Sequence, residues 1–334
     1  FVLMMLMQLG GLNVVSFGVV FAIFLRLGVS VRQEGLDNYI GTDSFFTAKG
    51  IFVKILFICL AIEFIGAIII YYSFPDELKF SSSGHKFFSA LFHSVSGFQT
   101  AGLTLFTNSI YEPCLRNVYS VQLCLSAVSF LGALGIPALF DLFSIPNIKE
   151  RWKKPWKQMH ISTYIAFYGS IMLIVTGTIL FFILEYDNVL LNLSYPGKFM
   201  ASLFQVVSAN STTGYNTVDI GLLKTPTLLM IMSLLFIGAG SGSTAGGIKT
   251  STVTIILLSI YGIVRGKKNL EFHKRTISYQ MLDTAYAIFL FAVIIISSAI
   301  FALSIIEPQF SFLNISFEVV ASWSTGGFSM GITQ

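Results

Sequence analysis

KFMASLFQVVSANSTTGY, at residues 198–215, is a segment that occurs three times in this chain in variant form. One copy is KFFSALFHSVSGFQTAGL at residues 86–103, and the other is SFLNISFEVVASWSTGGF at residues 311–328. The copies align without a gap, and each ends in Thr-x-Gly followed by Leu, Tyr or Phe. Their terminal glycines are 112 and 113 residues apart: Gly102, Gly214 and Gly327. Three matches in frame at nearly equal spacing indicate an internal structural repeat.

The composition around these copies is that of an integral membrane protein. Of the 334 residues, 54% are hydrophobic and only 11% are charged, and the mean hydropathy is +0.79. A soluble domain of this length needs far more charge on its surface. A helix of about 20 apolar residues crosses a bilayer core. We therefore expect an all-α protein embedded in the lipid bilayer, with its clearest spans at residues 51–72, 121–140, 161–184 and 285–306.

The basic residues indicate which side of the membrane each loop occupies. If each apolar run crosses once, 15 of the 20 Lys and Arg residues fall on one side, which the positive-inside rule assigns to the cytoplasm. These are Arg26, Arg32, Lys49, Lys54, Lys149, Arg151, Lys153, Lys154, Lys157, Lys249, Arg265, Lys267, Lys268, Lys274 and Arg275. The opposite side holds Lys79, Lys86, Arg116, Lys198 and Lys224. We expect a multi-pass protein of the cytoplasmic (inner) membrane, and no nucleic-acid partner, because the basic loops abut membrane spans.

Each copy of the repeat has the same surroundings. A long apolar run precedes it, its first part makes about three helical turns, and the Thr/Gly-rich end leads, where the chain continues, into a second apolar run. This order predicts a helix, a short re-entrant helix, an irregular segment and a second helix. Irregular backbone at membrane depth is tolerated only where it lines water or is buried in protein. The repeat therefore predicts a pore.

The same pattern predicts the organisation of the chain. The expected units are the second helix of repeat 1 at 1–27, repeat 2 at 50–143, repeat 3 with a broken second helix at 160–265, and the first helix and pore loop of repeat 4 at 277–334. Glycines in the second helices follow the Thr-x-Gly glycines by 24 and 30 residues. The same distances counted back from Gly10 place another such glycine about 15 to 21 residues before Phe1. We therefore expect a part of a four-repeat protein without its first filter and last helix.

The Thr-x-Gly ends have the chemistry of a cation filter. A dehydrated potassium ion needs a ring of oxygens, which filters supply from backbone carbonyls, and glycine permits the backbone that aims them at one axis. The candidate filter is Thr100, Ala101, Gly102 and Leu103, then Thr212, Thr213, Gly214 and Tyr215, then Thr325, Gly326, Gly327 and Phe328. The first three carbonyls of each group are the candidate K⁺ ligands. Polar turns between spans are the alternative, which three copies in register disfavour.

A second special segment, GAGSGSTAGGIKTST at residues 238–252, interrupts the hydrophobic stretch 228–264. Five of its first ten residues are glycine, enough to break a helix. Broken helices mark sites or gates in membrane transport proteins. A close crossing of small residues is the alternative. The predicted gate loop comprises Ala239, Gly240, Ser241, Gly242, Ser243, Thr244, Ala245, Gly246, Gly247 and Lys249.

The remaining polar residues predict no catalytic site. His93, Gln205 and Glu318 share one repeat position, where Glu318 could anchor its helix or add a negative field, and we favour anchoring. Glu63 lies in mid-span, where an acid is a functional candidate or a satisfied helix contact. The three cysteines and four histidines show no disulfide or zinc spacing. No acid, base or metal set converges, so we expect no enzyme and no organic cofactor.

Several of these motifs resemble one family. Residues 242–250, GSTAGGIKT, resemble the broken-helix loop of the Trk/Ktr/HKT potassium transporter superfamily. Residues 211–217, 327–333 and 8–12 resemble its third filter, its fourth filter and the helix after its first filter. The resemblance covers essentially the whole chain, and the bacterial TrkH/KtrB pore subunits look closest. It implies four repeats around one pseudo-fourfold pore, filter glycines at Gly102, Gly214 and Gly327, and a gate at residues 239–249.

The resemblance also implies partners and an activity. It implies a homodimer with one pore per subunit, and a cytosolic regulatory subunit of the TrkA/KtrA type that binds nucleotides. The expected function is potassium uptake, with K⁺ as the transported ion. Sodium or mixed transport through the same architecture is the alternative, because the residue that separates the two preferences in this family belongs to the first filter. A membrane-embedded enzyme and a structural scaffold are more distant alternatives, and neither explains the repeated filters.

Overall fold

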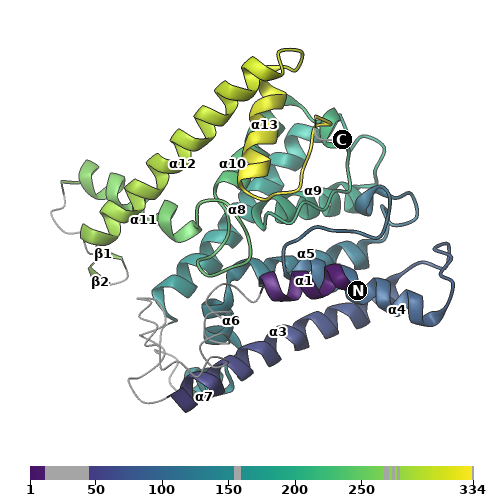
Figure 1. Ribbon diagram of the computed structural model, residues 1–334, viewed down its shortest axis with the longest axis horizontal. Helices are drawn as coiled ribbons and strands as arrows, with labels where there is room; N and C mark the ends of the chain where they lie inside the picture. The colour runs from purple at the N-terminus through teal and green to yellow at the C-terminus, as the bar shows by residue number, and fades with distance from the viewer. Residues whose placement is uncertain (12–44, 154–158, 267–270, 273–274, 277–278, 333–334) are drawn as a thin grey trace.

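The computed structural model describes residues 1–11, 45–153, 159–266, 271–272, 275–276 and 279–332 (Figure 1). Apart from the two-residue strands β1 (Glu271–Phe272) and β2 (Arg275–Thr276), the regular elements in these ranges are helices. The expected helix at 1–27 is therefore described only as α1 (Val2–Gly11). Seven of the basic residues assigned above lie outside the described residues: Arg26, Arg32, Lys154, Lys157, Lys267, Lys268 and Lys274.

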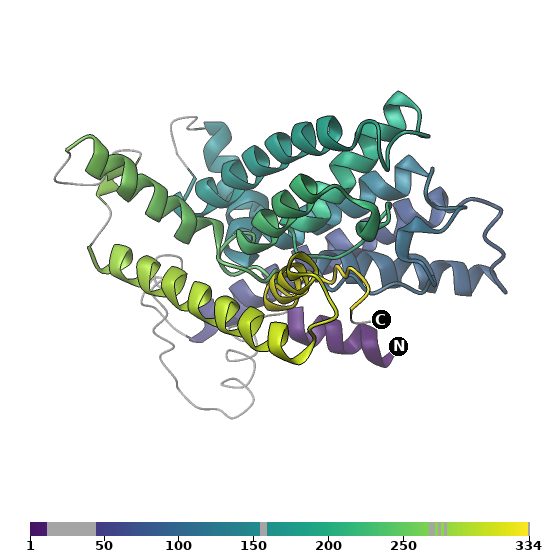
Figure 2. The ribbon, with the colours of Figure 1, turned by 90° about the horizontal axis from the view of Figure 1, so that it is seen from above.

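Three described helices are long and apolar enough to cross a membrane. They are α3 (Phe45–Ser73), α8 (Ile161–Glu185) and α12 (Tyr279–Ile306). Only 11% of the most apolar part of α12 is buried inside the protein, although its mean hydropathy is 2.8. An exposed apolar surface of this size is unfavourable in water. A helix suits the lipid bilayer, because its apolar side chains face lipid and its backbone hydrogen bonds are all made within the helix. The N-terminal ends of all three helices lie toward the same edge of the molecule (Figures 1 and 2).

Three shorter helices correspond to the copies of the repeat: α4 (Ser83–Phe98), α9 (Tyr195–Asn210) and α13 (Phe312–Trp323). Each begins at a serine N-cap whose Oγ accepts a backbone N–H three residues on, as expected for helix starts. They pack against the preceding long helix, α4 on α3, α9 on α8 and α13 on α12. At 12 to 16 residues, they are too short to span a bilayer.

The helices predicted to be the second helices of repeats 2 and 3 are both interrupted. In repeat 3, α10 (Thr225–Phe236) and α11 (Thr250–Val264) flank the glycine-rich loop. In repeat 2, the sequence predicts one span at residues 121–140, but the structure has two helices there, α5 (Tyr119–Leu134) and α6 (Ile136–Phe143), which meet at 105°. The bend falls at Gly135, whose φ of 91° and ψ of 151° are open only to glycine, and Pro137 starts the new helix. The short helix α7 (Ile145–Lys153) follows α6.

The buried core has two main parts. One surrounds α3, α4 and α5, and its largest fully buried side chains include Ile70, Leu125 and Tyr215. The other surrounds α8, α9, α10 and α13, with Phe181 and Phe317 among its fully buried side chains. Between them, α5 packs on α9, and Tyr215 of repeat 3 extends into the repeat 2 core. The two 3₁₀ turns, η1 (Ser109–Tyr111) and η2 (Ile220–Leu222), lie in the loops that follow the Thr-x-Gly segments.

Candidate functional site

The three Thr-x-Gly segments share one backbone conformation. Thr100, Thr212 and Thr325 have φ values of 51°, 52° and 53°, in the left-handed region that β-branched residues rarely adopt. Each threonine follows the C-cap of its helix in a Schellman arrangement. The threonine N–H donates to the carbonyl three residues before it, and the N–H of the next residue donates to the carbonyl five residues before that residue. The bonds are Thr100 N to Gly97 O and Ala101 N to Ser96 O, Thr212 N to Ala209 O and Thr213 N to Ser208 O, and Thr325 N to Ser322 O and Gly326 N to Ala321 O.

The glycines continue this pattern. Gly102, Gly214 and Gly327 have φ values of 65°, 85° and 67°, whereas the residues between the threonine and the glycine do not have positive φ. A chain that alternates between left-handed and ordinary backbone can point successive carbonyls to the same side. This is the geometry that a column of carbonyl ligands needs. The sequence predicts positive φ at the glycines, but it gave no signal for the threonines.

The three segments lie side by side, with that of repeat 3 in the middle. A Cβ at Gly102 would overlap the Thr213 carbonyl oxygen and lie 3.6 Å from Gly214 Cα. A Cβ at Gly214 would lie 2.5 Å from Gly326 O and 2.8 Å from Gly327 Cα. The backbones are thus too close for any side chain at these glycines. Residues 112 or more apart in the sequence therefore meet at one place, at the C-terminal ends of α4, α9 and α13.

The residue after each glycine fixes its segment by a different contact. The Leu103 carbonyl accepts from Ser96 Oγ at 2.8 Å and lies 3.4 Å from Tyr215 Oη, so it is engaged by the protein. Tyr215 is fully buried and ties the repeat 3 segment to repeat 2. Phe328 is buried in the core around α13. Of the three, Leu103 alone is exposed, at 43%.

The predicted gate loop is held at its base by backbone hydrogen bonds. Ile237 and Ile248 form a parallel bridge, and Ile248 N donates to Phe236 O at 2.9 Å. Thr250 N donates to the carbonyl of the buried Ala239 at 3.0 Å. The loop between α10 and α11 is therefore closed at its base, and Gly242 and Gly247 in it have φ values of 73° and 72°.

One side of this loop packs on the bend in repeat 2. Gly240 N donates to Ala133 O at 2.9 Å, and Ile136 N donates to Gly242 O at 3.2 Å. A Cβ at Gly135 would lie 2.5 Å from Ser241 O, so the bend and the loop fit only because this residue is glycine. Within the loop, Ser241 Oγ lies 2.6 Å from the hydroxyl of Ser251 on α11. The bend and the broken helix form one structure.

The other side of the loop contacts the threonines of the Thr-x-Gly segments, a contact that no sequence pattern predicts. Thr100 Oγ1 donates to Thr244 Oγ1 at 3.0 Å, and Gly246 N donates to Thr212 Oγ1 at 2.9 Å. A Cβ at Gly246 would lie 2.6 Å from Thr325 Oγ1. The hydroxyls of all three equivalent threonines thus border the loop.

Lys249 stabilises the loop from within. Its ammonium donates to Ala245 O at 2.5 Å and to the buried Ser243 Oγ at 3.3 Å. Both acceptors belong to the loop itself. An ammonium bound to loop oxygens places a positive charge beside the segment that borders the filter.

The two acids noted in the sequence have hydrogen-bonded roles. Glu318 does anchor, since its Oε1 accepts from Ser329 Oγ and Met330 N, each at 2.7 Å. Glu63 is 2% exposed and accepts from Gln8 of α1 and, at 2.8 Å, from Gln99 Nε2. These bonds fit the interpretation of Glu63 as a satisfied contact between helices. One of its partners, Gln99, directly precedes Thr100 of the first Thr-x-Gly segment.

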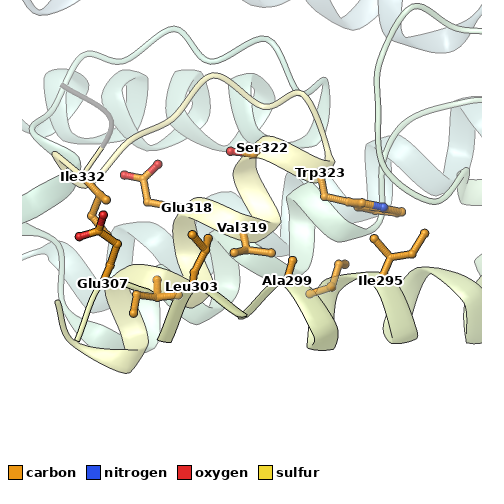
Figure 3. A pocket seen from close by; sticks show the side chains of 11 residues that line it. Ile295, Ala299, Leu303, Glu307, Glu318, Val319, Ser322, Trp323 and Ile332 are labelled. Atoms are coloured by element: carbon orange, nitrogen blue, oxygen red, sulfur yellow. The ribbon is translucent and has the colours of Figure 1, made fainter. Parts of the chain in front are cut away.

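A groove of about 510 Å³ runs between α12 and α13 (Figure 3). Apolar side chains form most of its walls, including Ile295 and Ala299 of α12 and Val319 and Trp323 of α13. Figure 3 shows Glu318 toward one end and Trp323 toward the other. None of the residues that line the groove belongs to a Thr-x-Gly segment.

Comparison with known proteins gives consistent matches along the chain. The model of the family described as "TrkH: Cation transport protein" matches residues 1–334. The Ktr system potassium uptake protein B of Vibrio alginolyticus is 32% identical over 334 residues, which cover 99% of this chain and 70% of that protein. The potassium/sodium uptake protein NtpJ of Enterococcus hirae is 28% identical over 337 residues, covering 100% of this chain and 72% of that protein.

A solved structure has the same fold. The crystal structure of the potassium transporter TrkH from Vibrio parahaemolyticus superposes with a TM-score of 0.67 at 18% identity. The superposition covers 95% of this chain and 62% of that one. The helices described above therefore have the arrangement of that protein over most of their length.

Proposed function

The chain belongs to the TrkH family of cation transport proteins, and we propose that it moves potassium ions across the inner membrane through a filter of backbone carbonyls. The observation that carries this proposal is the convergence of three Thr-x-Gly segments with the same alternating backbone. The ligands are the carbonyls of Thr100, Ala101 and Gly102, of Thr212, Thr213 and Gly214, and of Thr325, Gly326 and Gly327. Helices α4, α9 and α13 end at this place, and the partial negative charge of a helix C-terminus favours a cation there.

The protein is built from helix–pore loop–helix repeats around a pseudo-fourfold pore, with units at 1–27, 50–143, 160–265 and 277–334. The shared order of long helix, short helix and Thr-x-Gly segment in α3–α4, α8–α9 and α12–α13 supports this organisation. The middle segment is buried at Thr212 and Thr213, while Ala101 and Gly327 on the flanking segments remain exposed. These exposed edges leave room for a fourth segment that would close the ring.

The loop 239–249 acts as a gate at the inner mouth of the filter. Its support is the hydrogen bonding of Thr244 and Gly246 to Thr100 and Thr212 of the proposed filter. We assign the loop side of the filter to the cytoplasm, because Arg265 at the end of α11 is one of the basic residues that the positive-inside rule places there. Because hydrogen bonds join the loop to the filter, a change in the ions bound in the filter can change the position of the loop.

The protein works as a homodimer with one pore per subunit, together with a cytosolic TrkA/KtrA-type subunit that binds nucleotides. Support for a second component is the description of the Vibrio relative as a protein of a Ktr system. Helix α7, whose Lys149 and Lys153 are exposed, lies at the molecular edge that we assign to the cytoplasm (Figure 1).

Radioactive rubidium uptake in cells without their own potassium transporters tests the proposed function. We expect the complete protein, as its gene encodes it, to restore uptake and growth at low potassium. A parallel measurement with radioactive sodium tests the alternative of a sodium or mixed transporter. The Enterococcus relative is named a potassium/sodium uptake protein, which is the reason to measure both ions. Sodium uptake that equals or exceeds rubidium uptake would favour a sodium or mixed transporter. No uptake of either ion would contradict the transport proposal.

A further inference from the structure

One side chain in each repeat reaches past the filter to the backbone beyond it. His93, Gln205 and Glu318 stand at the same repeat position, directly after a phenylalanine that all three copies share, which is Phe92, Phe204 or Phe317. Each accepts a hydrogen bond from the backbone N–H twelve residues further on, which is three residues after the filter glycine. The bonds are Leu105 N to His93 Nε2 at 3.4 Å, Thr217 N to Gln205 Oε1 at 3.2 Å, and Met330 N to Glu318 Oε1 at 2.7 Å.

The imidazole of His93 is set up to act as an acceptor. Its Nδ1 lies 2.7 Å from Ser89 O, and because a carbonyl can only accept, Nδ1 carries the hydrogen. The other ring nitrogen, Nε2, is therefore free to accept from Leu105 N. The ring also stacks on Phe106, with centroids 4.7 Å apart. A histidine, a glutamine and a glutamate thus perform the same acceptor role.

These bonds complete the anchoring of each filter segment. At its inner end the segment is tied to its helix by the Schellman bonds at the threonine. At its outer end it is tied to the same helix by the acceptor side chain, which is buried in every repeat, at 1% exposed for His93, 0% for Gln205 and 5% for Glu318. Thr217 is 1% exposed, and a buried N–H without a partner is strongly unfavourable. Leu105 and Met330 are more exposed, so loss of the acceptor there removes a hydrogen bond that holds the outer end to the helix.

We propose that His93, Gln205 and Glu318 are positioning residues that set how strongly the filter discriminates between potassium-sized ions and sodium. The inference rests on the proposed function, because it assumes that the Thr-x-Gly carbonyls bind the ion. A segment fixed at both ends keeps its carbonyls at the spacing of the larger ion. A segment fixed only at its inner end can close around the smaller one. Loss of an acceptor therefore lowers discrimination without removing a ligand.

The test compares rubidium and sodium uptake by the complete protein and its variants. Gln205→Met and Glu318→Met keep the length of the side chain and remove the acceptor. Each is expected to lower the rubidium-to-sodium uptake ratio about fivefold, the effect of one hydrogen bond of about 1 kcal/mol. Gln122→Met is the matched control, because Gln122 is equally buried but donates to Arg116 O, away from the filter. That control is expected to keep the wild-type ratio.

Acceptor-retaining exchanges separate positioning from packing. His93→Gln installs in repeat 2 the acceptor that repeat 3 uses, and Glu318→Gln keeps the accepting oxygen. Both are expected to retain more discrimination than the methionine variants. An unchanged ratio in methionine variants that reach the membrane would overturn the proposal. If those variants do not accumulate there, the glutamine exchanges decide, since a fivefold loss despite a retained acceptor would also overturn it. No rubidium uptake by the wild type would instead contradict the proposed function itself.

Discussion

At the scale of single residues, the proposed filter depends on positions where a Cβ has no room. Gly214 is the central case, because it stands between the repeat 2 and repeat 4 segments with a φ of 85°. A Cβ there would lie 2.5 Å from Gly326 O, a contact that only a backbone shift can relieve. A side chain at this residue therefore displaces the neighbouring carbonyls as well as its own.

We predict that Gly214→Asp abolishes rubidium uptake while the protein still reaches the membrane. The carboxylate would occupy the ion path and push the backbones of two segments apart. Gly84→Asp is the control, because Gly84 lies in the exposed first turn of α4 and a Cβ there would meet nothing nearer than Ser82 Oγ at 3.7 Å. Rubidium uptake by the Gly214 variant at the level of the Gly84 control would remove Gly214 from the filter.

Residue patterns predicted the glycine conformations but not those of the threonines. Glycine adopts positive φ freely, so the Thr-x-Gly motif itself indicated Gly102, Gly214 and Gly327. Threonine is strained at the same φ, and only the Schellman bonds from the helix end explain why Thr100 and its equivalents adopt it. Those bonds depend on where each helix stops, which propensity defines only to within a residue or two.

At the scale of elements, the sequence predicted that the helix in repeat 3 breaks, but not what the break contacts. Five glycines within ten residues are a local signal that needs no tertiary information. The bonds from the loop to Thr100 and Thr212 join residues 144 and 34 positions apart, which a local pattern cannot show. The bend at Gly135 was missed for the same reason, since the apolar run continues through it without a change in composition.

We predict that Thr244→Val raises the basal rubidium flux without changing the rubidium-to-sodium ratio. Valine has nearly the shape of threonine but no hydroxyl, so the change removes the bond to Thr100 Oγ1 and leaves the filter backbone intact. A loop held less firmly spends more time away from the inner mouth. Efflux from rubidium-loaded proteoliposomes measures this flux. The control is Thr176→Val on the exposed face of α8, where the hydroxyl bonds to its own helix at Met172 O. A flux that only falls would indicate that the loop supports the pore and does not gate it.

At the scale of the whole molecule, the repeat was the part of the fold that the sequence determined best. The nearly equal spacing predicts that three segments share one structure, and α4, α9 and α13 do share their position after a long helix and their C-terminal turn. The order of the segments around their meeting point was not predictable, because it depends on which helices pack together. The contact of α5 with α9 and the burial of Tyr215 across the boundary decide it.

The parallel course of the long helices gives the last prediction, on membrane orientation. In α3, α8 and α12 the N-terminal end lies toward the edge that also holds α7, the end of α11 and the β1–β2 hairpin (Figures 1 and 2). Lys153 is exposed at the end of α7, whereas Asp187 is exposed in the turn that follows the C-terminal end of α8. The positive-inside rule assigns the first edge to the cytoplasm.

Single cysteines at these positions test the assignment in a background where Cys114, the one free cysteine that is not buried, is replaced by serine. We expect a membrane-impermeant maleimide to label Asp187→Cys in intact cells, and Lys153→Cys only after the membrane is opened. The two sites are both exposed, so each serves as the accessibility control for the other. The reverse pattern would place the gate loop on the outer side of the filter, and it would contradict a gate controlled from the cytoplasm.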